Sequence, residues 1–221
     1  MIDKNPWLNE VIQKLRERFG KRLLYCGLQG SYARGENTET SDFDLVVLLD
    51  NLGADDLTAY KQILSSMPEN EKLCGFIGAA QVLAAWPKSD LLQFSKETKD
   101  YFGKLQDFLP QITEEDVKAG ARTAAANIYH AACHTFMCYG ENAPEDQLKE
   151  LCKSASFVVQ SNYYIKTGEY VYSKKDLPAK ITGEDKEILS FYLDWNKNRI
   201  PAKEVLDKLL RWSGNLLTFY K

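Results

Sequence analysis

Two nearby stretches decide the fold: Leu28-Gln29-Gly30-Ser31-Tyr32-Ala33-Arg34-Gly35-Glu36 and Ser41-Asp42-Phe43-Asp44-Leu45-Val46-Val47. The apolar residues before Gly30 predict a strand that runs into a glycine turn. Glycine lets the backbone turn sharply and approach a bulky anion, and Ser31 can cap the helix that follows. The free N–H groups of that helix's first turn would suit a phosphate. Taken alone, Gly-Ser is equally an ordinary strand-to-helix turn.

The second stretch brings two carboxylates together. In a strand, residues two apart project to the same face, so Asp42 and Asp44 are expected side by side, about 6–7 Å apart along the chain. Carboxylates this close repel one another unless a cation lies between them. Mg²⁺ suits such a pair, because it takes a few carboxylate oxygens and completes its shell with water and substrate phosphates. The alternative is a polar turn in which one aspartate caps the strand.

The combination of the two stretches resembles the nucleotidyltransferase superfamily of DNA polymerase beta. That signature is Gly-Ser, a glycine a few residues later, and then Asp-x-Asp on a strand. The resemblance implies that Asp42 and Asp44 bind two Mg²⁺ ions and align a nucleoside triphosphate for attack by an acceptor hydroxyl. It also implies a nucleotide-binding set around the turn. This set is Gly30, Ser31, Arg34 and Ser41.

A third carboxylate is usual in that superfamily, on a neighbouring strand, where it completes a metal site or takes the acceptor's proton. Asp90, in Ser89-Asp90-Leu91-Leu92-Gln93-Phe94, is the expected catalytic and metal-binding residue here. Glu97 and Asp100 follow closely and are rivals. Asp90 could equally begin a strand without any catalytic part.

The first half of the chain alternates predicted helices and strands. Apolar residues at helical spacing after Pro6 predict a helix that ends at Gly20. Strands are expected at Leu23 to Leu28, Asp42 to Leu49, Leu73 to Ile77 and Leu91 to Phe94, and helices at Asp55 to Ser66 and Ala79 to Trp86.

The second half is predicted to be helical throughout. Acidic residues after Thr113 favour a helix start, because the helix dipole stabilises them there. Helical periodicity covers Asp116 to Tyr139, Asp146 to Thr167, Gly183 to Asn196 and Ala202 to Tyr220. The fold class is therefore α+β: a small mixed-sheet nucleotidyltransferase domain over residues 1–110, followed by an all-α helical bundle domain over residues 111–221.

Part of the helical half resembles the C-terminal domain of aminoglycoside nucleotidyltransferases. In those enzymes a helix ends in Thr-Gly-Glu and a Ser-Lys segment follows, and here Thr167-Gly168-Glu169 precedes Ser173-Lys174. The resemblance implies an acceptor pocket between the two domains, in which acidic residues receive a cationic small molecule.

Two other groups on the helices have ordinary explanations. His130, Cys133, His134 and Cys138 share one helix face, but one straight helix cannot wrap four ligands around a zinc ion, so core packing is expected. Four aromatic residues near the C-terminus recur at helical spacing and are expected in the core or at a homodimer face. These residues are Trp195, Trp212, Phe219 and Tyr220.

Composition narrows the partners. The net charge is −3, with 13 basic and 16 acidic residues through residue 112 and 15 of each beyond it. Neither half has the basic excess of a protein that follows a nucleic-acid backbone, so no nucleic-acid partner is expected. No apolar run approaches the length of a membrane span. Five cysteines without a framework spacing favour a reducing cytoplasm.

The expected function is transfer of a nucleoside monophosphate, AMP from ATP, to a hydroxyl of a small-molecule acceptor such as an aminoglycoside-like compound. One alternative is an antitoxin-like nucleotidyltransferase whose acceptor is a protein side chain. Another is a non-catalytic module that binds a nucleotide.

Overall fold

The chain forms two compact units, Met1–Gln111 and Ile112–Lys221. The computed structural model describes residues 6–35, 37–39, 41–197 and 200–220. The division falls next to the boundary expected near Pro110. Each unit is described by itself below.

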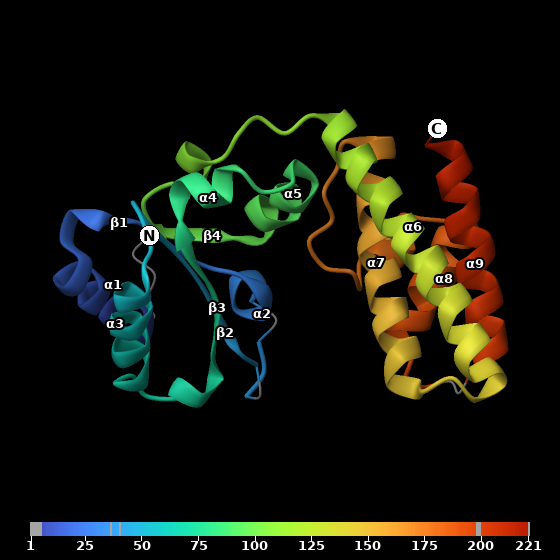
Figure 1. Ribbon diagram of the computed structural model, residues 1–221, viewed down its shortest axis with the longest axis horizontal. Helices are drawn as coiled ribbons and strands as arrows, with labels where there is room; N and C mark the ends of the chain where they lie inside the picture. Colours follow the sequence, from blue (N-terminus) through green and yellow to red (C-terminus); the bar gives the residue numbers. More distant parts are fainter. Residues whose placement is uncertain (1–5, 36, 40, 198–199, 221) are drawn as a thin grey trace. The chain divides into compact units, whose positions relative to one another are not determined.

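The first unit alternates helices with the strands of one mixed sheet (Figure 1). Its strands are β1 (Leu23–Leu28), β2 (Phe43–Leu49), β3 (Leu73–Ala79) and β4 (Lys99–Phe102). Its helices are α1 (Pro6–Phe19), α2 (Gly30–Arg34), α3 (Ala54–Ser65), α4 (Ala80–Ala84) and α5 (Lys88–Glu97), with 3₁₀ turns η1 (Gly20–Arg22), η2 (Asn70–Lys72) and η3 (Leu105–Phe108). The strand order is β3-β2-β1-β4, with β2 parallel to β3 and β1 antiparallel to both neighbours.

The central strand β2 sets the two faces of this sheet. Its run Leu45 to Leu49 is fully buried, as expected for a strand covered on both sides. Leu45 and Val47 pack with the apolar stripe of α1 and with α3, which cover one face (Figure 1). Because side chains alternate along a strand, Asp44 projects to the opposite face, on the side of α4 and α5.

One predicted strand is wrong. Leu91 to Phe94 belongs to helix α5, which buries Leu91 and Leu92 and carries Asp90 in its first turn. A short apolar run does not distinguish a buried strand from a helix segment, and the sequence Leu-Leu-Gln-Phe was such a case. The edge strand that borders β1 on the side away from β2 is β4, a four-residue element that the sequence did not predict.

The second unit is a bundle of helices (Figure 1). These are α6 (Glu114–Tyr139), α7 (Glu145–Thr167), α8 (Gly183–Leu193) and α9 (Ala202–Phe219), with 3₁₀ turns η4 (Gly140–Asn142) and η5 (Leu177–Ala179). Thr113 and Asp116 cap α6 reciprocally, since the Thr113 hydroxyl accepts from the Asp116 N–H and the Asp116 carboxylate accepts from the Thr113 N–H. The mixed sheet followed by a helical bundle confirms the predicted fold class.

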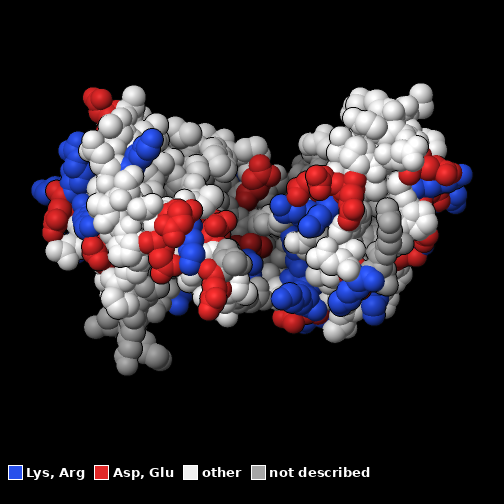
Figure 2. Space-filling model, turned by 90° about the horizontal axis from the view of Figure 1, so that it is seen from below, with Lys and Arg blue, Asp and Glu red and all other residues white. Residues whose placement is uncertain are grey.

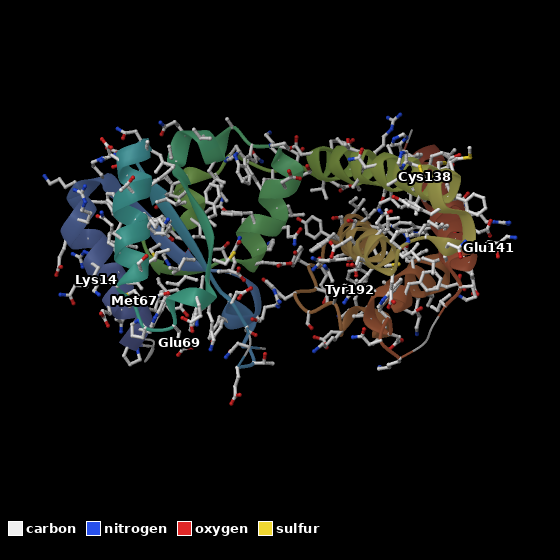
Figure 3. All side chains as sticks on the ribbon, turned by 60° about the horizontal axis from the view of Figure 1, so that its bottom comes forward. Lys14, Met67, Glu69, Cys138, Glu141 and Tyr192 are labelled. Carbon is white, nitrogen blue, oxygen red and sulfur yellow. The ribbon has the colours of Figure 1, made fainter. Side chains whose placement is uncertain are left out.

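The core packing expected for the histidines and cysteines of α6 is wrong, because His130, His134 and Cys138 are exposed and Cys133 is half-buried. The aromatic residues near the C-terminus differ from one another. Trp212 is 2% exposed, whereas Phe219 is 71% exposed. Cys138 lies at the C-terminal end of α6 close to Glu141 (Figure 3), and its thiol is 3.7 Å from the His134 ring nitrogen Nε2. Within the described ranges, no group of three His, Cys, Asp or Glu residues is gathered for a metal. Among those same residues, no helix combines the length and the apolar character needed to cross a membrane.

An ion pair fixes α3 to the end of η1. The Arg22 guanidinium donates to both Asp56 oxygens, at 2.8 and 2.9 Å, and the Gly53 N–H donates to the same carboxylate at 3.0 Å. These bonds to the charged form lower the pKa of Asp56 to about 2, with Arg22 as the main cause.

We predict that Asp56→Asn lowers the melting temperature by a few degrees at pH 7. A carboxyl whose pKa is lower in the folded state stabilises the protein above its unfolded pKa, and loses that contribution as the pH falls through the folded value. The difference between variant and wild type should therefore shrink below pH 4 and be mostly lost by pH 2, as measured by circular dichroism melts. A difference that does not change with pH would contradict the role of the ion pair.

Candidate active site

The Gly30 turn and the Asp44 side chain meet at the mouth of β2. Gly30 has φ +67°, and a Cβ placed on it would overlap Oδ2 of Asp44. The Gln29 N–H also donates to the Asp44 carbonyl at 2.8 Å, which ties the turn to the strand. Both the left-handed backbone and the close approach require glycine at this position.

Two carboxylates share this position, as the sequence predicted. Asp42 is exposed and Asp44 is half-buried. Burial raises the pKa of Asp44 above its usual range, the Asp42 charge raises it further, and the Arg34 guanidinium opposes both. The Asp44 carboxylate is thus held close to the like charge of Asp42. This arrangement costs free energy, and a bound cation would remove that cost.

The two serines lie in turns on either side of this pair. Gln29 occupies the N-cap position of α2 without a capping side-chain bond, so Ser31 lies inside the first turn and the expected serine cap is wrong. Ser41 closes the turn before β2, where its hydroxyl accepts from the Thr38 N–H at 2.9 Å. Their predicted contacts with a nucleotide stay predictions.

Helix α2 is held against the C-terminal end of α5. The Gln29 side-chain amide donates to the Thr98 hydroxyl at 2.7 Å, and Arg34 forms an ion pair with Glu97 at 3.4 Å. Gln93, one turn earlier on α5, donates to the other Glu97 oxygen at 3.5 Å. Their side chains are largely covered, with 25% of Arg34 and 14% of Glu97 exposed. Glu97 is thus linked to the carboxylate pair through Arg34.

The other two candidates for the third carboxylate lie elsewhere. Asp90 is exposed in the first turn of α5, where its carboxylate accepts from the Ser89 hydroxyl at 3.2 Å. It is separated from Glu97 by two turns of helix, about 10 Å along the axis. Asp100 on β4 accepts from the Tyr25 hydroxyl at 2.8 Å and from the Leu105 N–H at 3.3 Å. A catalytic role for Asp90 stays a prediction, and its placement does not favour it.

The register between β2 and its neighbour β3 could not be predicted from the sequence. The parallel register pairs Asp44 with Cys74 of β3, so the residue next to Asp44 on that face is an exposed cysteine. The resemblance had implied a carboxylate on a neighbouring strand, but no periodicity in the sequence could fix which residue of β3 opposes Asp44. By contrast, the spacing of Gln93 and Glu97 on one helix face was a detectable signal once α5 is known to be a helix.

The donor set of the site fits Mg²⁺ as a partner of a bound triphosphate. Among the residues that the structure describes, no third His, Cys, Asp or Glu joins Asp42 and Asp44. Mg²⁺ needs only one or two carboxylates when phosphates and water supply its other ligands. Positive and negative side chains are interspersed on the face of each unit seen in Figure 2, without a broad basic field.

A sequence model of the nucleotidyltransferase domain matches residues 8–120, which is just over half of the chain. The chain belongs to the nucleotidyltransferase family. The family and enzyme class predicted from the Gly-Ser and Asp-x-Asp stretches are confirmed. The matched range includes α2, β2 and α5, which carry or adjoin the candidate site residues.

Two known proteins extend the comparison. A "Putative protein adenylyltransferase MJ1305" from Methanocaldococcus jannaschii is 48% identical over 48 residues, which are 22% of this chain and a third (33%) of the length of that relative. Spectinomycin adenyltransferase AAD(9) from Enterococcus faecialis, whose crystal structure contains ATP and spectinomycin, superposes with a TM-score of 0.58. The superposition covers 96% of this nucleotidyltransferase and 98% of that chain at 14% identity, so it shows the fold alone.

We predict that Asp44→Asn makes the metal-free nucleotidyltransferase more stable at pH 7. A raised folded pKa means that the charged carboxylate opposes folding above that pKa, and the amide removes the charge at nearly constant volume. The gain in melting temperature should disappear below the usual carboxyl pKa, where wild-type Asp44 is protonated too. Adding Mg²⁺ with ATP should stabilise the wild type and not the variant. A variant less stable than wild type at pH 7 would refute the electrostatic conflict.

The role of α5 is tested by two matched substitutions on that helix. We predict that Glu97→Gln weakens binding of MgATP by roughly tenfold, about 1.4 kcal/mol, because it releases Arg34. Asp90→Asn, an equal loss of charge at an exposed position, should change binding and turnover by less than about twofold. Isothermal titration and steady-state kinetics would measure both. The opposite order would restore Asp90 as the third carboxylate.

Proposed function

We propose that this chain transfers AMP from ATP to a hydroxyl of a small-molecule acceptor, with Mg²⁺ as the required metal. The observation that carries the proposal is the pair Asp42 and Asp44 beside the glycine turn. The Asp44 carboxylate, whose pKa is raised by burial and by the Asp42 charge, lies against a backbone turn that approaches it too closely for any side chain at Gly30. Family membership supplies the reaction class.

In this proposal each part of the site has one task. Asp42 and Asp44 would hold two Mg²⁺ ions, which supply charge neutralisation at the phosphates. The Gly30–Ser31 turn and Ser41 would hold the β- and γ-phosphates, and Arg34 would add a charge-assisted contact to phosphate. The acceptor oxygen forms a bond to the α-phosphorus as the bond from that phosphorus to the bridging oxygen breaks. Pyrophosphate leaves, and the acceptor hydroxyl gives up its proton to solvent water.

A pocket in the helical unit supports a small, cationic acceptor. It has a volume of about 470 Å³ and its lining includes Glu184, Asp185 and Trp212. Asp185 is held by the Trp212 indole N–H at 2.9 Å and by Lys166 at 3.1 Å, while Glu184 accepts from Asn215 at 3.3 Å. Acidic and aromatic groups of this kind suit an amine-bearing compound such as an aminoglycoside.

All five cysteines are free thiols, which supports a cytoplasmic location.

A second candidate acceptor is a protein side chain. The relative from Methanocaldococcus jannaschii is named as a protein adenylyltransferase, and the matched stretch is 48% identical. That stretch spans a third of the relative, so the protein acceptor rests on a partial likeness alone.

The experiment that tests these proposals is transfer from ATP labelled at the α-phosphate. We expect the label to appear on small molecules that carry both amines and free hydroxyls. The transfer should release pyrophosphate and require Mg²⁺. The Asp42→Asn and Asp44→Asn variants serve as inactive controls. Label found on protein from a host lysate would favour the protein acceptor. Binding of MgATP without transfer to either class would identify a non-catalytic nucleotide-binding module.

A further inference from the structure

Three aromatic rings are stacked behind the carboxylate pair. Phe43, the residue between the two aspartates, lies 4.5 Å from the Trp7 ring and 4.1 Å from the Tyr32 ring, centroid to centroid. The interplanar angles are 14° and 22°, so both partners lie face to face with Phe43. A phenyl ring has two faces, and each is covered by one partner. The stack therefore runs from α1 through β2 to α2.

The stack joins the strand that carries the two aspartates to the glycine turn. Phe43 is buried on the face of the sheet opposite to Asp42 and Asp44. Tyr32 directly follows Ser31 in the glycine turn. One ring thus belongs to the metal-binding strand and the next to the phosphate-binding turn, and their contact spans the two halves of the site.

Helix α2 needs such a contact. It has five residues, and an isolated helix of that length is unstable because nucleation costs more than so few hydrogen bonds return. Its other anchors, Gln29 with Thr98 and Arg34 with Glu97, hold it to α5. Tyr32 holds it to β2, together with the backbone bond from the Gln29 N–H to the Asp44 carbonyl just before the helix. The stack itself is fixed from behind, because the Trp7 indole N–H donates to the Pro68 carbonyl at 2.9 Å.

We propose that Tyr32 and Phe43 are a positioning pair, which sets the separation between the Gly30–Ser31 turn and the Asp42–Asp44 carboxylates. This inference rests on the proposed function, since the separation matters only if one ligand, a magnesium-bound nucleoside triphosphate, touches both halves. Tyr32 acts through its ring and not through its hydroxyl, because the face of the ring makes the contact.

The test compares two substitutions at Tyr32. Tyr32→Phe keeps the ring and should bind MgATP within about twofold of wild type. Tyr32→Leu keeps an apolar side chain without a planar ring and should bind at least about tenfold more weakly, with a further fall in turnover, because a misplaced site loses catalysis steeply. Binding is measured by isothermal titration on protein shown to be folded by circular dichroism. Trp7→Leu, further from the site, should give a smaller loss of the same sign.

The outcomes separate this inference from the proposed function. Equal MgATP affinity for wild type, Tyr32→Leu and Trp7→Leu would overturn the positioning role, even if Tyr32→Leu melts at a lower temperature. Wild-type protein that binds no MgATP would overturn the proposed function together with the inference. If Tyr32→Leu does not fold, Tyr32→Met replaces it, and unchanged affinity in that variant would equally overturn the role.

Discussion

The carboxylate of Asp44 lies over the Cα of Gly30, with no room between them for a side chain. This contact brings a strand end and a helix start to one point, and the other features of the site follow from it. Asp42 is brought next to the half-buried like charge of Asp44, Arg34 is close enough to act on that charge, and α2 must be anchored by side chains. The sheet and its helices provide the rigid frame that makes so close an approach reproducible.

Much of this arrangement follows from local sequence signals. The glycine turn, the Asp-x-Asp pair and the long amphipathic helices could be predicted because each depends on residues close in sequence. The course of α5 could not, since Leu91 to Phe94 suits a strand or a helix equally and the packing of both leucines decides. Likewise, the residue opposite Asp44 depends on the register of β3, which a sheet sets over its whole length.

The third carboxylate shows the same limit. The local pattern around Asp90 favours it as the third carboxylate, whereas Glu97 is connected to the site by Arg34, a partner 63 residues earlier in the chain. Long-range pairs of this kind carry no local signal. The helical unit shows the same contrast. Its helix cap and apolar stripes could be predicted from residues close in sequence, whereas the residues that line its pocket could not.

The shortness of α2 has a consequence for how the protein loses activity. Its five residues are held to the sheet and to α5 mainly by side chains, so it can open as a local unit while the strands stay paired. Local opening of this kind costs less free energy than global unfolding. Warming should therefore separate the two halves of the site before the secondary structure melts, and amide hydrogens of α2 should exchange with solvent sooner than those of β1 and β2.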